Sequence, residues 1–424
     1  MSKLYSLNNT QAWERLRNVQ PDLYAKTRNH LNGDVSRLSP FVTHGLLGTP
    51  DLYAWGCEQT GRTLHPAQDK WVMELGWREF FQHVLKHQSW SVLKPLRAPA
   101  NGVWLGDLDM PHDVLTAQTG IPAIDMAVKE LIQTGYLHNH ARMWLASYLI
   151  HIRKVSWLKG ANWMLGWLFD GDVASNHLSW QWVASTFSSK PYLFNADNVA
   201  KYAPTAWHSS NTILDCSYED MAIQAASTFE VPMQSAHSAG ISTQINSPLA
   251  LPANELYSRP PKALIDRYAI ERIDKPQLIE TALLSHDAWV HPWCLNASNS
   301  QSRPNVGLLS AQYHQQWPWS YQRWELVLAA MAESSKIWLW IEPEVWFSTD
   351  FLNKIYSTRS NRRAQCMRTY QPGYRDMLEA FEHAKLVQLE EVPNLWESPP
   401  HCCSSFSQWI RKSKFIGASI HTGN

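Results

Sequence analysis

The chain contains 424 residues, of which 45% are hydrophobic, and its 37 basic and 37 acidic side chains give a formal net charge of zero. This length predicts two or three domains with a sizeable core. The balanced charge excludes a strongly basic chain and leaves only a local basic face for nucleic acid. Of the 23 tryptophans, we expect most in the core and the remainder to stack on flat ligands or carry electrons.

Cysteine usage and apolar runs indicate the compartment. The six cysteines form no CxxC pair, and their spacing suits neither zinc nor an iron–sulfur cluster. We therefore expect no metal and a reduced, intracellular protein. The first residues, MSKLYSLNNTQAWER, lack the apolar core of a signal peptide, and no run has the length of a membrane span. These features predict a soluble cytoplasmic protein without membrane contact.

The first half, residues 1–205, is predicted to be all-helical. Its apolar residues recur at three- and four-residue spacing, and turns containing Gly or Pro separate the runs. The predicted helical runs are Trp71–Leu85, Ile124–Leu131, Met143–Val155 and Trp163–Phe169.

The second half changes in character. Residues 206–284 include a stretch rich in Ser, Pro, Ala and Asn that reads as a linker or wrapping segment. From 285 to 424, the runs Trp289–Leu295, Ile337–Ile341 and Leu386–Leu389 suit buried strands. Helices are expected at Tyr321–Glu333 and Tyr374–His383. This alternation predicts a smaller α/β unit with a parallel sheet after a mainly α domain.

Two segments near the N-terminus carry polar residues that suit a ligand. In Ser36–Pro40, hydroxyls and backbone amides at a helix start can bind phosphate, although the same pattern is also an ordinary helix entry. In KWVMELGWREFF, Trp71, Glu74 and Arg78 share one helix face, and Trp77 lies beside Glu74. Taken alone, that face is better explained as a core-facing aromatic stripe with a surface Glu–Arg pair.

Two further segments concentrate polar groups that need partners. His138–Met143 places His, Asn and Arg close together, and the two histidines at i and i+2 point to different sides of a helix, which disfavours a metal. Asp170–Thr186 combines two acids, Asn176 and two tryptophans. A buried Arg needs a carboxylate, so Arg142 and Asp170 are natural partners.

Together and in this order, these motifs resemble the FAD-binding domain of the DNA photolyase/cryptochrome family. The resemblance covers roughly Tyr24 to Pro204. It rests on SRLSPFVTHG, ELGWREF, GIPAIDMAV, LHNHARM and DGDVASNHLSWQWVAST.

The resemblance implies an FAD cofactor folded into a U shape within a helical domain. Val35 stands where the family commonly has Thr. By the resemblance, Tyr24 and the Ser36–Ser39 loop hold the pyrophosphate and ribityl chain, and the other positions line the ring. The implied cofactor-binding residues are Tyr24, Ser36, Leu38, Ser39, Trp71, Arg78, Asn139, Arg142, Asp170, Asp172 and Asn176.

The resemblance also implies a pocket for damaged DNA. Glu74 matches the acid that hydrogen-bonds the pyrimidines, Trp77 and Trp182 match the flanking indoles, and Met143 matches a sulfur-bearing contact. Family members that repair (6-4) photoproducts have a His pair where this chain has Asn139 and Met143. The resemblance therefore indicates cyclobutane dimers, although His140 replaces a common Arg.

Three tryptophans match the electron-transfer chain of the family, in the order Trp180, Trp157 and Trp104. The alternative is that they are packing residues. Because the FAD-domain motifs begin by Tyr24, we expect no N-terminal antenna domain and no conventional antenna site. The α/β unit is then a candidate to replace the packing role of that domain. Lys190 and Lys201 are candidate phosphate contacts.

These features favour an enzyme, a deoxyribodipyrimidine photolyase that repairs cyclobutane pyrimidine dimers by electron transfer from reduced FAD. Its expected partner is dimer-containing DNA, with single strands as plausible as duplex. The alternatives are a cryptochrome-like photosensor without repair activity and a flavoprotein with neither role. The sequence carries no indication of oligomeric state.

Overall fold

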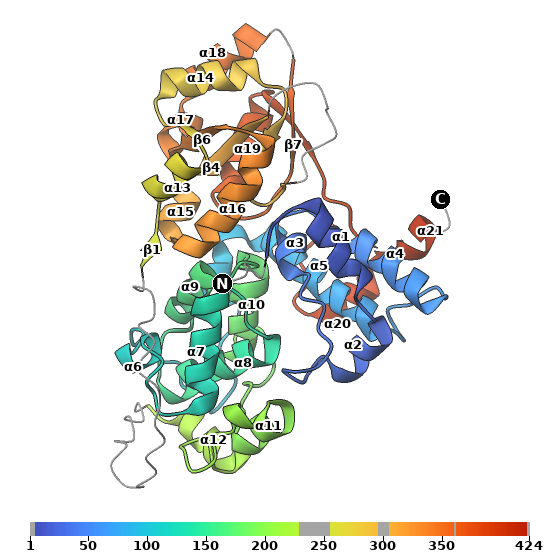
Figure 1. The fold of residues 1–424 in the computed structure, drawn as a ribbon, viewed down its shortest axis with the longest axis vertical. Coiled ribbons are helices and arrows are strands. Elements are labelled where there is room, and N and C mark those ends of the chain that lie inside the picture. Colours follow the sequence, from blue (N-terminus) through green and yellow to red (C-terminus); the bar gives the residue numbers. More distant parts are fainter. Residues whose placement is uncertain (1–4, 229–254, 296–304, 360–361, 422–424) are drawn as a thin grey trace.

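The computed structural model describes residues 5–228, 255–295, 305–359 and 362–421. The first half is built of helices, and the second adds parallel strands (Figure 1). The prediction of a mainly helical chain with some sheet is confirmed. None of the described helices is long and apolar enough to cross a bilayer.

The helical half contains short and medium helices, with a 3₁₀ turn at Ser89–Leu93, a π-helical turn at Tyr148–Ile152 and a 3₁₀ turn at Thr205–Trp207. The predicted helix Met143–Val155 is therefore two elements, since its second part winds as the π turn. The α-helices are α1 (Asn9–Arg17), α2 (Pro21–Thr27), α3 (Ser39–Thr43), α4 (Thr49–Thr60), α5 (Lys70–Gln88), α6 (His112–Leu115), α7 (Pro122–Thr134), α8 (Asn139–Ser147), α9 (Trp157–Trp167), α10 (Val173–Val183), α11 (Ala196–Tyr202) and α12 (Tyr218–Ala226).

Local signals set the ends of the helices that carry the motifs. α7 begins with Pro122 and ends at Gly135, whose φ of 66° is a left-handed conformation that glycine adopts without strain. α10 begins after Asp172, whose carboxylate accepts a hydrogen bond from the Ser175 amide. α5 ends with Lys86 and His87 in its last turn, where positive charge is favourable.

The α/β unit starts with strands and helices that lie upstream of residue 285. The sheet therefore begins before residue 285, where the sequence pattern had placed its start. The pattern missed β2 and α14 because each is polar on one side. The elements are β1 (Leu256–Tyr257), α13 (Lys262–Arg267), β2 (Glu271–Ile273), α14 (Pro276–Ser285), β3 (Trp289–Val290), β4 (Val306–Ser310), α15 (Ala311–Gln316), β5 (Trp319–Ser320), α16 (Tyr321–Ser334), β6 (Ile337–Ile341), α17 (Pro343–Phe347), α18 (Thr349–Arg359), β7 (Ala364–Met367), α19 (Tyr374–His383) and β8 (Val387–Glu390).

The central strands pair in parallel in the order β2-β6-β4-β3. A parallel bridge from Ala288 to Gln365 continues this sheet to the parallel pair β7-β8. β4 is buried at every position and β6 at all but the first, as expected for strands covered on both faces. At Gly307, a Cβ would lie 2.9 Å from both Met331 and Trp338, so the close packing of β4 requires glycine.

The last part of the chain, residues 394–421, leaves the α/β unit and returns to the helical half, where it lies beside α4 and α5 (Figure 1). We call this segment the C-terminal arm. It holds β9 (Trp396–Glu397), α20 (Phe406–Lys412), β10 (Lys414–Phe415) and α21 (Gly417–His421), with β9 and β10 antiparallel. One continuous hydrophobic core joins α3–α5, the parallel sheet and the arm. The two halves are therefore packed as one body.

Candidate functional site

The motif residues gather where α2, α5, α8 and α10 approach one another. On α5, Trp71 is buried and its indole donates to the Leu52 carbonyl at 3.0 Å. Tyr24 of α2 lies edge-on to this indole, with ring centroids 5.1 Å apart. Arg28, which caps the C-terminus of α2, pairs with Glu74 at 3.2 Å. The Glu74 face of α5 thus meets α2.

An ion pair forms the centre of this region. Arg142 on α8 donates through Nη2 to both oxygens of Asp170, at 3.0 and 2.9 Å, and through Nε to the Leu137 carbonyl at 2.7 Å. Burial disfavours the charged carboxylate, but the charge and hydrogen bonds of Arg142, with a hydrogen bond from Ser39, keep the pKa of Asp170 below its usual range. The pair is therefore ionised at neutral pH.

Arg78 connects α5 to the same pair. Its Nη2 donates at 2.9 Å to Thr43 Oγ1, and that hydroxyl donates to the Asp170 carbonyl at 3.2 Å. The guanidinium of Arg78 also lowers the pKa of Asp170. A cation on α5 and a cation on α8 thus face one carboxylate.

The second acid, Asp172, is 2% exposed and caps α10. Its Oδ1 accepts from the Ser175 amide at 2.9 Å and from Gln82 Nε2 at 3.1 Å. Its Oδ2 is buried without a hydrogen-bond partner among the described residues. Asn176, one turn into α10, donates to the Ala161 carbonyl at 2.8 Å. One carboxylate oxygen therefore stays free to accept from a ligand.

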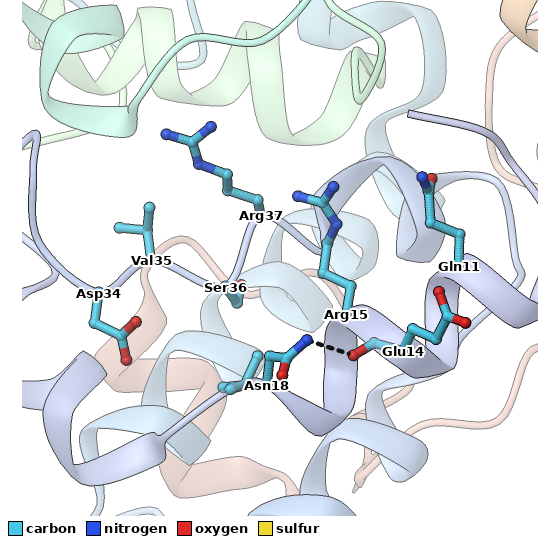
Figure 2. A pocket seen from close by; sticks show the side chains of 9 residues that line it. Gln11, Glu14, Arg15, Asn18, Asp34, Val35, Ser36 and Arg37 are labelled. Carbon is cyan, nitrogen blue, oxygen red and sulfur yellow. Dashed lines mark hydrogen bonds between the residues drawn. The ribbon is translucent and has the colours of Figure 1, made fainter. Parts of the chain in front are cut away.

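The Ser36–Ser39 loop reaches this region from the opposite side. Leu38 is 1% exposed in the core, so only its backbone can face a ligand. Arg37 has a φ of 51°, in the left-handed region. Figure 2 shows Ser36 and Arg37 on the border of a hollow of about 430 Å³ that α1 closes with Arg15 and Asn18. This hollow leaves the loop accessible from the α1 side.

The donor set fits a dinucleotide with a hydrogen-bonding heterocycle. Three charged side chains among the packed helices remain partly exposed. The exposed fraction of the side chain is 21% for Arg28, 32% for Glu74 and 23% for Arg142. The Nε of Arg28 and the Nε2 of His138 are buried without hydrogen-bond partners among the described residues. Guanidinium groups suit a diphosphate, and the unpartnered polar atoms beside the Arg142–Asp170 pair suit the edge of a flavin.

The residues matched to the lesion pocket come from α5, α8 and α10. Glu74 and Trp77 lie on α5, and Met143 on α8 accepts a weak hydrogen bond from Asn139 Nδ2 at 3.6 Å. Trp182 on α10 lies 5.9 Å from the Tyr192 ring. All four side chains keep some exposed surface.

Trp77 is already stacked on one face. The ring of Phe406, from the C-terminal arm, lies parallel to it at 4.1 Å with an interplanar angle of 12°. Nothing in the local sequence of either residue indicates this contact, because the two are far apart in the chain.

The three tryptophans matched to an electron-transfer chain lie in separate elements. Trp180 of α10 packs against α9, where a Cβ at Gly160 would lie 2.4 Å from its ring. Trp157 begins α9, one turn before Gly160. Trp104 lies in a loop, is 49% exposed, and its amide donates to the Ala225 carbonyl at 3.0 Å. The order from buried to exposed is thus Trp180, Trp157 and Trp104.

The candidate phosphate contacts Lys190 and Lys201 are both exposed. The amine of Lys201 lies 5.1 Å from the centroid of the Tyr202 ring. That ring stands 5.0 Å from the ring of His140 on α8. Lys201 is therefore on the side of the molecule where α8 and α11 meet.

Two buried polar residues to which the resemblance assigns no role connect the helical half to the second half of the chain. Glu79 on α5 is buried and accepts from the Leu395 amide at 2.7 Å, the Trp396 amide at 3.1 Å and the Thr49 hydroxyl. Arg323, from α16, is fully buried and reaches the Gly171 carbonyl. An acid at a buried position of α5 is a signal available in the sequence, whereas Arg323 gives none.

Comparisons with known proteins show similarity over part of the helical half. Residues 71–207 match the family described as the FAD binding domain of DNA photolyase. The deoxyribodipyrimidine photo-lyase of Streptomyces griseus is 37% identical over 167 residues, which cover 38% of this chain and 35% of that protein. The enzyme of the same name from Escherichia coli is 35% identical over 166 residues, or 38% and 35% of the two chains. The match thus spans about a third of these relatives.

Solved structures also match. A Synechocystis cryptochrome is 26% identical with a TM-score of 0.41, covering 46% of this chain and 43% of that one. An archaeal photolyase from Sulfolobus tokodaii with two FAD molecules is 25% identical with a TM-score of 0.40, covering 52% and 50%. The resemblance to the photolyase FAD-binding domain is confirmed over residues 71–207, and FAD is the cofactor of that family.

Proposed function

We propose that this chain, whose residues 71–207 carry the FAD-binding domain of the DNA photolyase family, repairs cyclobutane pyrimidine dimers in DNA with light. The observation that supports this proposal most is the Arg142–Asp170 pair beside the unpartnered oxygen of Asp172. The curated relatives over this region are named deoxyribodipyrimidine photo-lyases. When bound, FAD supplies light absorption and one-electron chemistry.

The residues of the chain would bind and orient the reactants. Arg142, Asp170 and Asp172 would hold the cofactor ring. Tyr24, Ser36 and Ser39 would hold the diphosphate and ribityl chain. Leu38 would contribute its backbone, Trp71 would support Tyr24, and Asn139 and Asn176 would contribute amides to the ring site. Trp180, Trp157 and Trp104 form the route for electrons from the surface.

Glu74 would hydrogen-bond the damaged pyrimidines between the indoles of Trp77 and Trp182, with Met143 in contact. A cyclobutane dimer is poorly stacked in DNA, so extruding it costs less than extruding an intact base. Stacking on the indoles recovers about 1–3 kcal/mol per base. Single-stranded DNA needs no unpairing, which makes it a substrate at least as accessible as duplex. Lys190 and Lys201 are candidate phosphate contacts.

The decisive experiment is a repair assay with FAD-loaded, reduced protein. A dimer-containing oligonucleotide, single-stranded or in duplex, is illuminated with blue light, and dimer loss is measured by chromatography. Dimer should disappear in the light, remain in the dark and remain with Glu74→Gln under limiting DNA. No light-dependent loss on either form of DNA would refute the proposal. Light-dependent binding of a protein partner without repair would instead support a cryptochrome-like photosensor.

A further inference from the structure

Arg323 is a residue of the α/β unit that reaches into the helical half. It is the third residue of α16, where its amide donates to the capping hydroxyl of Ser320. Its Nη1 donates to the Leu165 carbonyl and its Nη2 to the Gly171 carbonyl, both at 2.5 Å. Gly171 lies between the two acids of the candidate site. The guanidinium is therefore hydrogen-bonded to the turn that carries Asp170 and Asp172.

Burying this guanidinium has a high cost. Its side chain has no exposed surface, and it makes no ion pair within 4 Å among the described residues. Burial lowers the pKa of Arg323 to about 10, and the negative charges of Asp170 and Asp172 are among the interactions that oppose that shift. A buried cation is stable only where dipoles and opposite charges replace its water. Here the two carbonyls and the Trp319 ring, 4.1 Å away, supply part of this replacement.

The two arginines of the helical half at this site, Arg142 and Arg78, both face Asp170. Asp170 is neutralised by Arg142 on α8. Asp172 makes no ion pair among the described residues, and one of its oxygens has no partner. Arg323 brings a further positive charge to the turn from the α/β unit. The cations of the helical half thus serve the first of the two acids, and Arg323 reaches the residue between the two.

Because Gly171 has no side chain, it leaves room for this guanidinium. A Cβ at this position would lie 2.7 Å from the Leu165 carbonyl oxygen and 2.8 Å from Arg323 Nη1. Both distances are too short for real contacts, so any side chain at position 171 would displace the guanidinium or the turn. Gly171 and Arg323 therefore form one geometrical unit, although 152 residues separate them.

We propose that Arg323 is a positioning residue of the FAD site: its hydrogen bonds to the Leu165 and Gly171 carbonyls fix the Asp170–Gly171–Asp172 turn. This inference rests on the proposed function, in that FAD occupies the site beside Asp172. If Arg323 has this role, the α/β unit contributes a residue to the cofactor site and also packs against the helical half.

The test compares Arg323→Met and Arg323→Lys with wild type and with Trp317→Phe. Trp317 lies in the same interface and donates to Asn162 Oδ1 at 2.9 Å, and among the described residues it makes no hydrogen bond to the turn. FAD binding to each apoprotein is measured by the quenching of flavin fluorescence, the flavin reduction potential by redox titration, and folding by thermal unfolding without FAD.

We expect Arg323→Met to weaken FAD binding about tenfold or more, the loss of a hydrogen bond to a charged group. Its flavin potential should become more negative, since a positive charge that acts on Asp170 and Asp172 is lost. Arg323→Lys should keep the potential and lose part of the affinity, because a lysine cannot bridge two carbonyls. Trp317→Phe should lower the unfolding temperature and leave both the affinity and the potential unchanged.

A second variant keeps the inference testable if Arg323→Met does not fold. Gly171→Ala should weaken FAD binding in a protein that keeps Arg323, because a Cβ there meets both Arg323 Nη1 and the Leu165 carbonyl and displaces the turn. Equal affinity and potential in wild type and the Arg323 variants would overturn the inference alone. Wild-type protein that binds no FAD would overturn the proposed function as well.

Discussion

The helical half and the α/β unit contribute to the candidate site in different ways. In the helical half, ligand-facing residues are grouped in short segments, such as Asp170–Thr186, and the family match covers residues 71–207. The α/β unit and the C-terminal arm contribute single residues from distant positions, such as Arg323 and Phe406. Residues that are grouped in one segment form a motif that can be recognised in the sequence. Residues that meet only through tertiary contacts form no such motif.

The largest expected effect comes from breaking the ion pair inside the helical half. Arg142→Met would leave Asp170 buried without its cation, which costs about 3–5 kcal/mol. We expect a large fall in the unfolding temperature and loss of bound FAD, measured by calorimetry and by flavin absorbance after purification.

Arg153→Met is the matched control for that experiment. Arg153 pairs with Asp113 at 2.7 Å elsewhere in the helical half. This variant should lose stability and retain FAD. If both variants retain FAD equally, the Arg142–Asp170 pair is a structural feature and the division between site and scaffold in this half is wrong.

Glu79 tests the connection between α5 and the C-terminal arm. Burial raises its pKa to about 7, against the pull of the Leu395 amide, the Thr49 hydroxyl and the Trp396 amide. The folded state therefore keeps this proton up to about pH 7, whereas the unfolded chain releases it at the ordinary pKa of 4.5. Between these values the folded state binds more protons, so stability falls as pH rises, by up to about 3 kcal/mol.

Glu79→Gln should remove that slope from the free energy of unfolding between pH 4.5 and 7, measured by urea titration. Thr49→Val keeps the carboxyl and loses one donor, so its slope should persist. Parallel pH curves for wild type and Glu79→Gln would mean that the carboxyl is ionised throughout this range. In that case the arm would be held by a charged acceptor at every pH.

Much of the helical half could be predicted because its signals are local. The α5 pattern indicated a helix over Trp71–Leu85, and the structure has Lys70–Gln88. The Arg142–Asp170 pair followed from the need of a buried guanidinium for a carboxylate, and the structure joins the two. In the α/β unit, Ile337–Ile341 and Tyr374–His383 also correspond to single elements.

The rest depended on contacts that a local pattern does not contain. Strand β4, Val306–Ser310, is five residues long and includes Gly307, so its apolar run is too short to distinguish a strand from a helix. Arg323 occurs in an amphipathic helix, where an arginine is ordinarily exposed. The return of residues 394–421 to α5 depends on Phe406, Trp409 and two backbone amides that meet α5 only in the folded chain.

The smallest expected effect concerns the arm and the lesion side of α5. Phe406 is partly exposed and stacks on Trp77. Phe406→Ala should therefore cost about 1–2 kcal/mol, less than the ~3–5 kcal/mol of a fully buried phenylalanine. Without its stacking partner, Trp77 gains rotamer freedom that must be lost again when DNA binds. We expect weaker binding of a dimer-containing oligonucleotide, measured by fluorescence anisotropy, with FAD affinity unchanged.

Phe415→Ala separates this effect from simple loosening of the arm. Phe415 also belongs to the arm and packs 5.5 Å from Tyr53 and 5.0 Å from Trp396, away from Trp77. It should lose similar stability and keep DNA affinity. If both variants lose DNA affinity equally, the arm acts on the whole of α5. If neither does, the arm only stabilises the fold, and the contribution of the second half to the site is confined to Arg323 and the turn it holds.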